Sequence, residues 1–70
     1  MPKLPCVSGQ KAARALERLG FERRQKGSHL VMRRGSAVCV VPIHREVDQG
    51  TLRGVLRQAG VSELEFAGAL

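Results

Sequence analysis

Apolar residues in the N-terminal part of the chain repeat with the period of an α-helix. After the polar Ser8, the stretch GQKAARALERLG carries apolar side chains at i, i+4 and i+7, which are Ala12, Leu16 and Leu19. The opposite side carries the basic residues Lys11, Arg14 and Arg18. We predict a helix that begins after Ser8 and ends at Gly20 in a left-handed turn, with Phe21 closing over the last turn.

The next part of the chain has the shorter period of β-strands. Residues 21–26, FERRQK, alternate weakly and are expected to form an edge strand. Gly27 permits a tight turn before a second strand, residues 28–33. Arg34-Gly35-Ser36 predicts a hairpin turn into AVCVVP, residues 37–42, a more buried strand that ends at Pro42. Short strands joined by tight turns favour an antiparallel sheet.

Alternation within residues 28–33 predicts which side chains share a face. Ser28, Leu30 and Met32 point one way, and His29, Val31 and Arg33 the other. If Leu30 and Met32 face the helices, His29 and Arg33 lie on an open face.

Helical signals return in the last third of the chain. Residues 43–50 are expected to form a loop, and Asp48 or Thr51 to cap the helix TLRGVLRQAG, which Gly60 ends. This helix has a clean apolar stripe of Leu52, Val55, Leu56 and Ala59. Ser62 and Glu65 have the spacing of a capping box that opens a short third helix.

The order α-β-β-β-α plus a short α predicts an α+β fold. A three-stranded antiparallel sheet is expected to have one face covered by the two longer helices and the other open. Residues 1–7, with Pro2 and Pro5, form an extended lead-in, and residues 1–70 make one domain. With only Phe21 and Phe66 as aromatic residues, aliphatic side chains must build the core.

Charge is the feature of composition that bears most on function. Nine of the twelve Lys and Arg fall in residues 1–34 against two acids, so that part carries about +7 and the remainder about −1. A small basic protein with its charge in one half suggests a polyanion partner, nucleic acid first. The chain has no Trp or Tyr, which weighs against RNA binding through aromatic stacking.

Other function classes find little support. No apolar run approaches the roughly 20 residues of a membrane span, and the N-terminus lacks a signal-peptide core, so a cytoplasmic protein without membrane association is expected. Cys39 lies in an apolar run and is expected to be a small buried residue rather than a disulfide partner of Cys6. No metal-ligand spacing and no phosphate-cradling loop occur, so neither metal nor cofactor is expected.

His29 is the residue with the clearest chemical potential. RNA carries its own nucleophile, the 2′-OH, so its cleavage requires a base, an acid and positive charge for the transition state. His29 is suited to proton transfer, and Gly27 would let backbone N–H groups approach an oxyanion. The candidates for neutralising the phosphate are Lys26, Arg23, Arg24 and Arg33. Metal-free RNA cleavage is the only chemistry that these residues clearly support.

Alternatives remain open from the residues alone. A strand histidine in a small basic domain is more often a binding or surface residue, so a non-catalytic RNA-binding module on the same face is the second interpretation. A module that grips an acidic protein is the third. His44 is more simply explained as holding the loop before the second long helix. Lys26 and His44 are candidates for a general acid, but a single-histidine mechanism with modest turnover is equally compatible with the residues. Arg53 and Arg57 suit a solvated helix face.

An ordered set of motifs resembles the HicA family of bacterial type II toxin–antitoxin systems. The segments are SGQKAARALERLGF, QKGSH, VVPIH and GTLRGVLRQAG, at matching spacings across nearly the whole chain. The resemblance implies a fold like the double-stranded-RNA-binding domain, an mRNA-cleaving activity and a neutralising HicB antitoxin that covers the active site.

The resemblance also implies roles for individual residues. The histidine of the family's Gly-Ser-His motif is catalytic, which here is His29, and Gly27 and Ser28 complete the motif. The chain departs from true double-stranded-RNA binders, which start their last long helix with a lysine cluster, because only Arg53 and Arg57 stand there. Duplex binding is therefore not expected as its main task.

Overall fold

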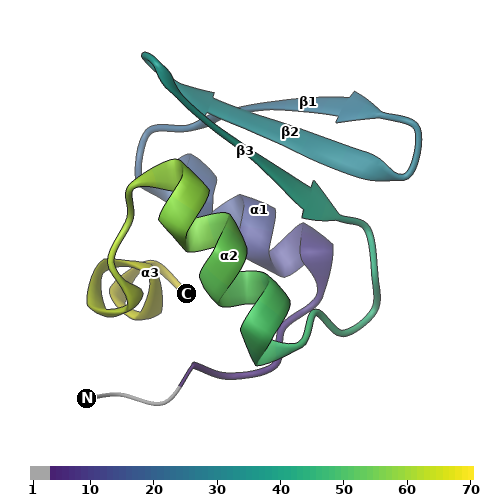
Figure 1. The fold of residues 1–70 in the computed structure, drawn as a ribbon, viewed down its shortest axis with the longest axis vertical. Helices are drawn as coiled ribbons and strands as arrows, with labels where there is room; N and C mark the ends of the chain where they lie inside the picture. Colours follow the sequence, from purple (N-terminus) through teal and green to yellow (C-terminus); the bar gives the residue numbers. More distant parts are fainter. Residues whose placement is uncertain (1–3) are drawn as a thin grey trace.

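Three antiparallel strands form a sheet in the order β1-β2-β3, and two helices, α1 and α2, cover one of its faces (Figure 1). The computed structural model describes residues 4–70. Its elements in chain order are α1 (Gly9–Arg18), β1 (Glu22–Lys26), β2 (His29–Arg34), β3 (Ala37–Pro42), α2 (Gln49–Ala59) and α3 (Glu63–Ala69). The α+β class and the order of elements are as predicted.

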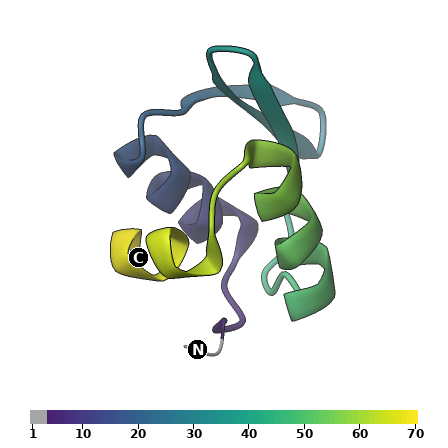
Figure 2. The same cartoon turned by 60° about the vertical axis from the view of Figure 1, so that its left-hand side comes forward.

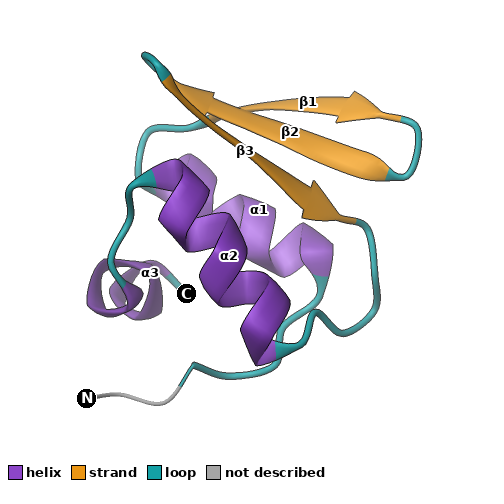
Figure 3. Cartoon of the chain, viewed as in Figure 1, coloured by secondary structure: helices purple, strands orange, loops and turns teal. Residues whose placement is uncertain are grey.

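The layers are clearest when the molecule is turned. In Figure 2 the sheet lies above the two long helices, and α3 lies beside α1 on the side away from the sheet. Figure 3 shows that the loops between these layers are short. Residues 1–3 of the predicted lead-in lie outside the described residues, while Val7 forms an isolated antiparallel bridge with Val47.

Both ends of α1 follow local signals in the sequence. The Ser8 hydroxyl accepts a hydrogen bond from the backbone N–H of Lys11 at 3.1 Å, which satisfies a free donor of the first turn. At the other end Gly20 has φ +98°, and the N–H groups of Gly20 and Phe21 donate to the carbonyls of Glu17 and Leu16. This is a Schellman ending, so the predicted stop at Gly20 is confirmed.

The sheet differs from the predicted one by a single residue in β2. The strand spans His29–Arg34 rather than 28–33, because Gly27 and Ser28 together form the two-residue loop of the first hairpin. Gly27 and Gly35 open the two hairpin loops with φ of +60° and +61°. The alternation itself is confirmed, since Leu30 and Met32 are buried while His29 and Arg33 are exposed.

The second long helix begins earlier than predicted. The loop after β3 ends at Asp48, whose carboxylate accepts from the Thr51 backbone N–H at 2.8 Å and from the Thr51 hydroxyl at 3.0 Å. Of the two candidate caps Asp48 is therefore the one used, and the helix includes Gln49 and Gly50. The same hydrogen bonds from Thr51 lower the pKa of the Asp48 carboxyl below its ordinary value.

The predicted capping box of the third helix is present. The Glu65 N–H donates to the Ser62 hydroxyl at 3.0 Å, and the Ser62 N–H donates to the Glu65 carboxylate at 3.3 Å. The helix carries Phe66, which is fully buried, into the core beneath the other two helices. Cys39 is buried and both cysteines are free thiols, as predicted, and burial raises the pKa of the Cys39 thiol to about 11.

Candidate active site

The open face of the sheet is built from three rows of side chains that cross the strands. Residues directly opposite one another in an antiparallel sheet point to the same face. His29 lies opposite Lys26 of β1 and Pro42 of β3. The next row joins Val31 to Arg24 and Val40, and the last joins Arg33 to Glu22 and Val38. His29 therefore occupies one end of a basic face, next to a hairpin turn.

Three of the four predicted phosphate-binding residues lie on this face with His29. Lys26, Arg24 and Arg33 are all exposed, and within residues 4–70 none of the three forms a salt bridge. Two hollows adjoin around Arg24 and Val31, one reaching Arg33 and the other Lys26. The row arrangement thus brings three free cations onto the face that presents the imidazole.

Arg23 lies apart from the other three. Its partner across the strands is Met32, so its side chain points toward the helices. Its guanidinium donates to the Gln10 amide oxygen at 2.7 Å and to the Glu17 carboxylate at 2.8 Å. Both acceptors belong to α1, so Arg23 holds β1 on that helix and is not brought together with His29.

The Gly27-Ser28 loop sets the start of β2. Gly27 needs its left-handed backbone but is not tightly packed, because a Cβ there would meet no atom within 4 Å. The Ser28 carbonyl accepts from the Ile43 N–H at 3.0 Å, which ties the loop to the segment after β3. The motif therefore fixes the place of His29 through its backbone.

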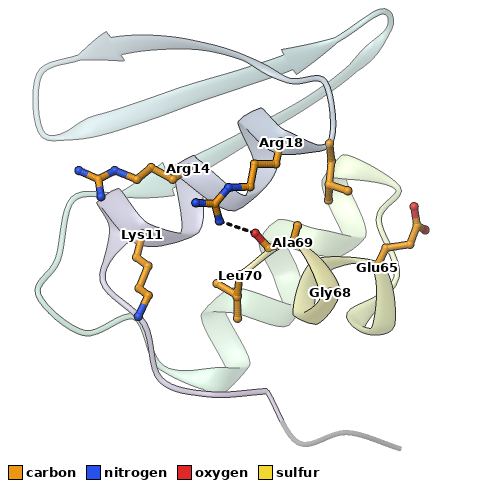
Figure 4. A pocket seen from close by; sticks show the side chains of 8 residues that line it. Lys11, Arg14, Arg18, Glu65, Gly68, Ala69 and Leu70 are labelled. Carbon is orange, nitrogen blue, oxygen red and sulfur yellow. Dashed lines mark hydrogen bonds between the residues drawn. The ribbon is translucent and has the colours of Figure 1, made fainter.

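A second basic hollow lies elsewhere, between α1 and α3 (Figure 4). Lys11, Arg14 and Arg18 line it from α1, while Gly68, Ala69 and Leu70 line it from the C-terminal end of the chain. The Arg18 guanidinium donates to the Ala69 carbonyl at 2.6 Å, a position where a short helix leaves its carbonyls unsatisfied. Arg18 therefore caps α3, and this hollow is explained by the fold.

The family model described as the HicA toxin of bacterial toxin–antitoxin systems matches residues 9–61. The chain belongs to the HicA toxin family. The match spans α1, the whole sheet and α2, so it includes His29 and every residue of the open face, and only α3 lies beyond it. A search of curated proteins gives no match.

Membership in the HicA family gives the chain its broad role. It is a toxin of a bacterial toxin–antitoxin system, and an antitoxin is its implied partner. Among the described residues no helix is long and apolar enough to cross a membrane. Nor do three His, Cys, Asp or Glu side chains within residues 4–70 gather in a group that would hold a metal ion.

The sequence analysis did not predict the apolar side chains on the open face of this HicA toxin. AVCVVP was expected to be a more buried strand, yet Val38 and Val40 are 38% and 42% exposed. The reason is alternation, because Cys39 and Val41 take the covered side and leave the other valines on the open one. With the half-buried Val31 they form a valine stripe, Val31, Val38 and Val40, along the β3 edge of the sheet. The cations of this face, on β1 and β2, lie on one side of that stripe.

The remaining cations of the HicA chain divide between structure and solvent. Arg53 donates to the Glu63 carboxylate at 3.0 Å and so links α2 to α3. Arg57 is exposed on the same helix. Arg53 is exposed as well, so both arginines lie on the solvated helix face expected for them, and Arg53 in addition has Glu63 as a partner.

Proposed function

We propose that the chain is a metal-independent endoribonuclease that cleaves mRNA in the cytoplasm with His29 as its proton-transfer residue, the whole of residues 1–70 acting as one domain. The observation that carries the proposal is the row Lys26–His29 on the open face, with Arg24 and Arg33 in the rows beside it. An exposed imidazole among three cations that form no ion pair within residues 4–70 has the composition that cleavage through the 2′-OH requires.

The chemistry follows from the groups on this face. His29 takes the proton of the 2′-OH, the oxygen attacks the neighbouring phosphorus, and the bond to the 5′ oxygen breaks. Negative charge grows on the phosphoryl oxygens during this step, and Lys26, Arg24 and Arg33 stabilise it. The leaving 5′ oxygen takes up a proton, and the products are a 2′,3′-cyclic phosphate and a 5′-hydroxyl end. Arg23 is left out of this scheme because α1 holds its guanidinium.

The decisive experiment compares wild type with His29→Ala on a labelled single-stranded RNA in EDTA. We expect wild type to leave cyclic phosphate ends and the variant to be slower by about 10²–10⁴-fold, the usual contribution of a general acid or base. A matched RNA with a 2′-deoxy nucleotide at the cut site should resist both proteins. Arg57→Ala serves as the control, since it removes an exposed charge far from the open face.

The result also separates the two remaining interpretations. If neither protein cuts but both bind RNA equally well, the chain is a binding module and His29 is an ordinary strand residue. If neither protein binds RNA at low salt, the open face serves a protein partner alone.

We further propose that a HicB-type antitoxin neutralises the toxin by covering this face. The valine stripe makes the β3 side of this face apolar, and the cations of β1 and β2 make the other side positive. Together they suit a partner that combines apolar contacts with acidic residues. Titration of purified antitoxin should abolish cleavage at one equivalent of binding sites. Undiminished cleavage at excess antitoxin would contradict the proposal.

A further inference from the structure

A second histidine lies at the end of the sheet that carries His29. His29 is directly opposite Pro42, the last residue of β3, and His44 follows two residues later. The Ile43 N–H donates to the carbonyl of Ser28, the residue just before His29, at 3.0 Å. The segment Pro42–His44 and the start of β2 are therefore held side by side, and each presents one imidazole.

This segment is fixed more firmly than a surface connection requires. The His44 N–H donates to the Pro42 carbonyl at 3.0 Å, and the His44 carbonyl accepts from the Gly9 N–H at 2.9 Å. Gly9 packs so closely here that a Cβ at position 9 would overlap the Pro42 carbonyl oxygen. The N-terminus of α1 thus supports the turn from below, and only glycine permits that approach.

The side chain of His44 takes no part in this support. Both of its backbone groups are used, while its side chain is exposed and forms no hydrogen bond or ion pair among residues 4–70. A residue needed only to hold the loop would require no imidazole, because any amino acid supplies the same backbone bonds. The structure therefore separates the holding role of His44 from whatever its ring does.

We propose that His44 is the general acid of the cleavage reaction. This inference rests on the proposed function and deepens it. In an in-line displacement the attacking and leaving oxygens lie on opposite sides of the phosphorus. One imidazole placed on the 2′-OH is therefore not also on the 5′ oxygen, and a second group is needed on the far side.

The proton balance is then complete. The O2′–P bond forms as His29 accepts the 2′-OH proton, and the P–O5′ bond breaks as His44 gives a proton to O5′. The reaction leaves His29 protonated and His44 neutral, and exchange with water restores both. Lys26, the other candidate acid, is in the same row as His29, and an ammonium group is a weaker acid than an imidazolium. It is better suited to stabilising the phosphate charge.

The test uses an RNA whose leaving oxygen at the cut site is replaced by a bridging sulfur. A thiolate leaves without a proton, so loss of a general acid matters little on this substrate. On the normal RNA we expect His44→Ala to be slower than wild type by about 10²–10⁴-fold. On the sulfur substrate we expect it to cut within about tenfold of wild type, while His29→Ala stays slow on both substrates.

Two further variants serve as controls. His44→Gln keeps a polar side chain of similar size and should behave as His44→Ala does. Arg45→Ala changes the adjacent exposed residue and should cut both substrates at the wild-type rate. Thermal melting of each variant monitors the fold, and His44→Gln carries the test if the alanine variant melts early.

The outcomes are distinct. Equal slowing of His44→Ala on both substrates, or wild-type rates on both, would overturn the assignment. Rescue of His29→Ala by sulfur in place of His44→Ala would overturn it as well, because the roles would be exchanged. If wild type cuts neither RNA, the proposed function itself fails and this inference falls with it.

Discussion

The two faces of the sheet use the same residue types for opposite purposes, and two pairs of neighbouring arginines make the difference plain. Arg23 and Arg34 point toward the helices, where Arg23 bonds Gln10 and Glu17 and Arg34 donates to the Leu19 carbonyl at 2.8 Å. The Arg34 guanidinium also lies 4.6 Å from the centre of the Phe21 ring. Their neighbours Arg24 and Arg33 have no such partners among the described residues.

The comparison shows that the face of the sheet to which an arginine points decides whether it stabilises the fold or remains free. Arg23 points toward α1 and is held there, whereas Arg24, the next residue of β1, points to the open face that carries His29. Substitutions on the covered face should therefore change stability, and those on the open face should change activity.

Met32→Ala should destabilise the protein strongly. The Met32 side chain is fully buried on the covered face of the sheet, and truncation of such a side chain typically costs about 2–5 kcal/mol of unfolding free energy. Val40→Ala, on the next strand but the open face, should cost less than about 1 kcal/mol because its side chain is 42% exposed. Urea unfolding of the two variants measures both, and equal losses would break the division between the faces.

Substitutions of the neighbours Arg23 and Arg24 should change different properties, stability in the first case and RNA binding in the second. Arg23→Ala should lower the unfolding free energy by about 1 kcal/mol, since it removes a partly exposed ion pair and a hydrogen bond. Arg24→Ala should leave stability unchanged but weaken RNA binding and reduce its salt dependence by about 0.7, the value for one phosphate contact on a single strand. Binding titrations across a salt series, beside melting curves, test the pair. An unchanged salt slope for Arg24→Ala would remove that residue from the RNA path.

The smallest effect is expected for Asp48→Asn, which tests whether a single charge contributes to stability separately from the hydrogen bonds of its side chain. Asparagine caps a helix as well as aspartate does, so the change removes the charge and keeps the cap. Because hydrogen bonds from Thr51 lower the pKa of Asp48 in the folded protein, its carboxylate stabilises the fold above the ordinary aspartate pKa. That contribution disappears as pH falls through the folded value. Wild type should therefore lose more stability than Asp48→Asn between pH 5 and pH 2, and parallel curves would contradict this.

The fold was largely predictable because its boundaries are local. Gly20, the Ser62–Glu65 box and the two hairpin glycines each act within a few residues of their own position, and all are where the sequence placed them. The two errors of boundary are also local. Ser28 entered a two-residue loop, and Gln49 and Gly50 belong to α2 rather than to the loop before it.

The candidate site was predictable only where alternation carried information. Leu30 and Met32 are strongly apolar, so the open position of His29 followed from them. In ERRQK no apolar residue marks the inner face, and the partners that capture Arg23 lie on a helix up to thirteen positions away. The approach of Pro42–His44 to Ser28 and Gly9 depends on tertiary packing, which no short pattern in the sequence encodes.

The closeness of Gly9 to the Pro42 carbonyl has a consequence for genetics. Cells that must survive without the antitoxin accumulate mutations that silence the toxin, and most amino acid positions offer some replacement that leaves activity intact. Position 9 offers none, because every other residue carries a Cβ that must displace the turn bearing His44. Among such survivors we therefore expect Gly9 to be replaced by residues of every chemical class. Outside the reacting groups, few positions should show that range of inactivating substitutions.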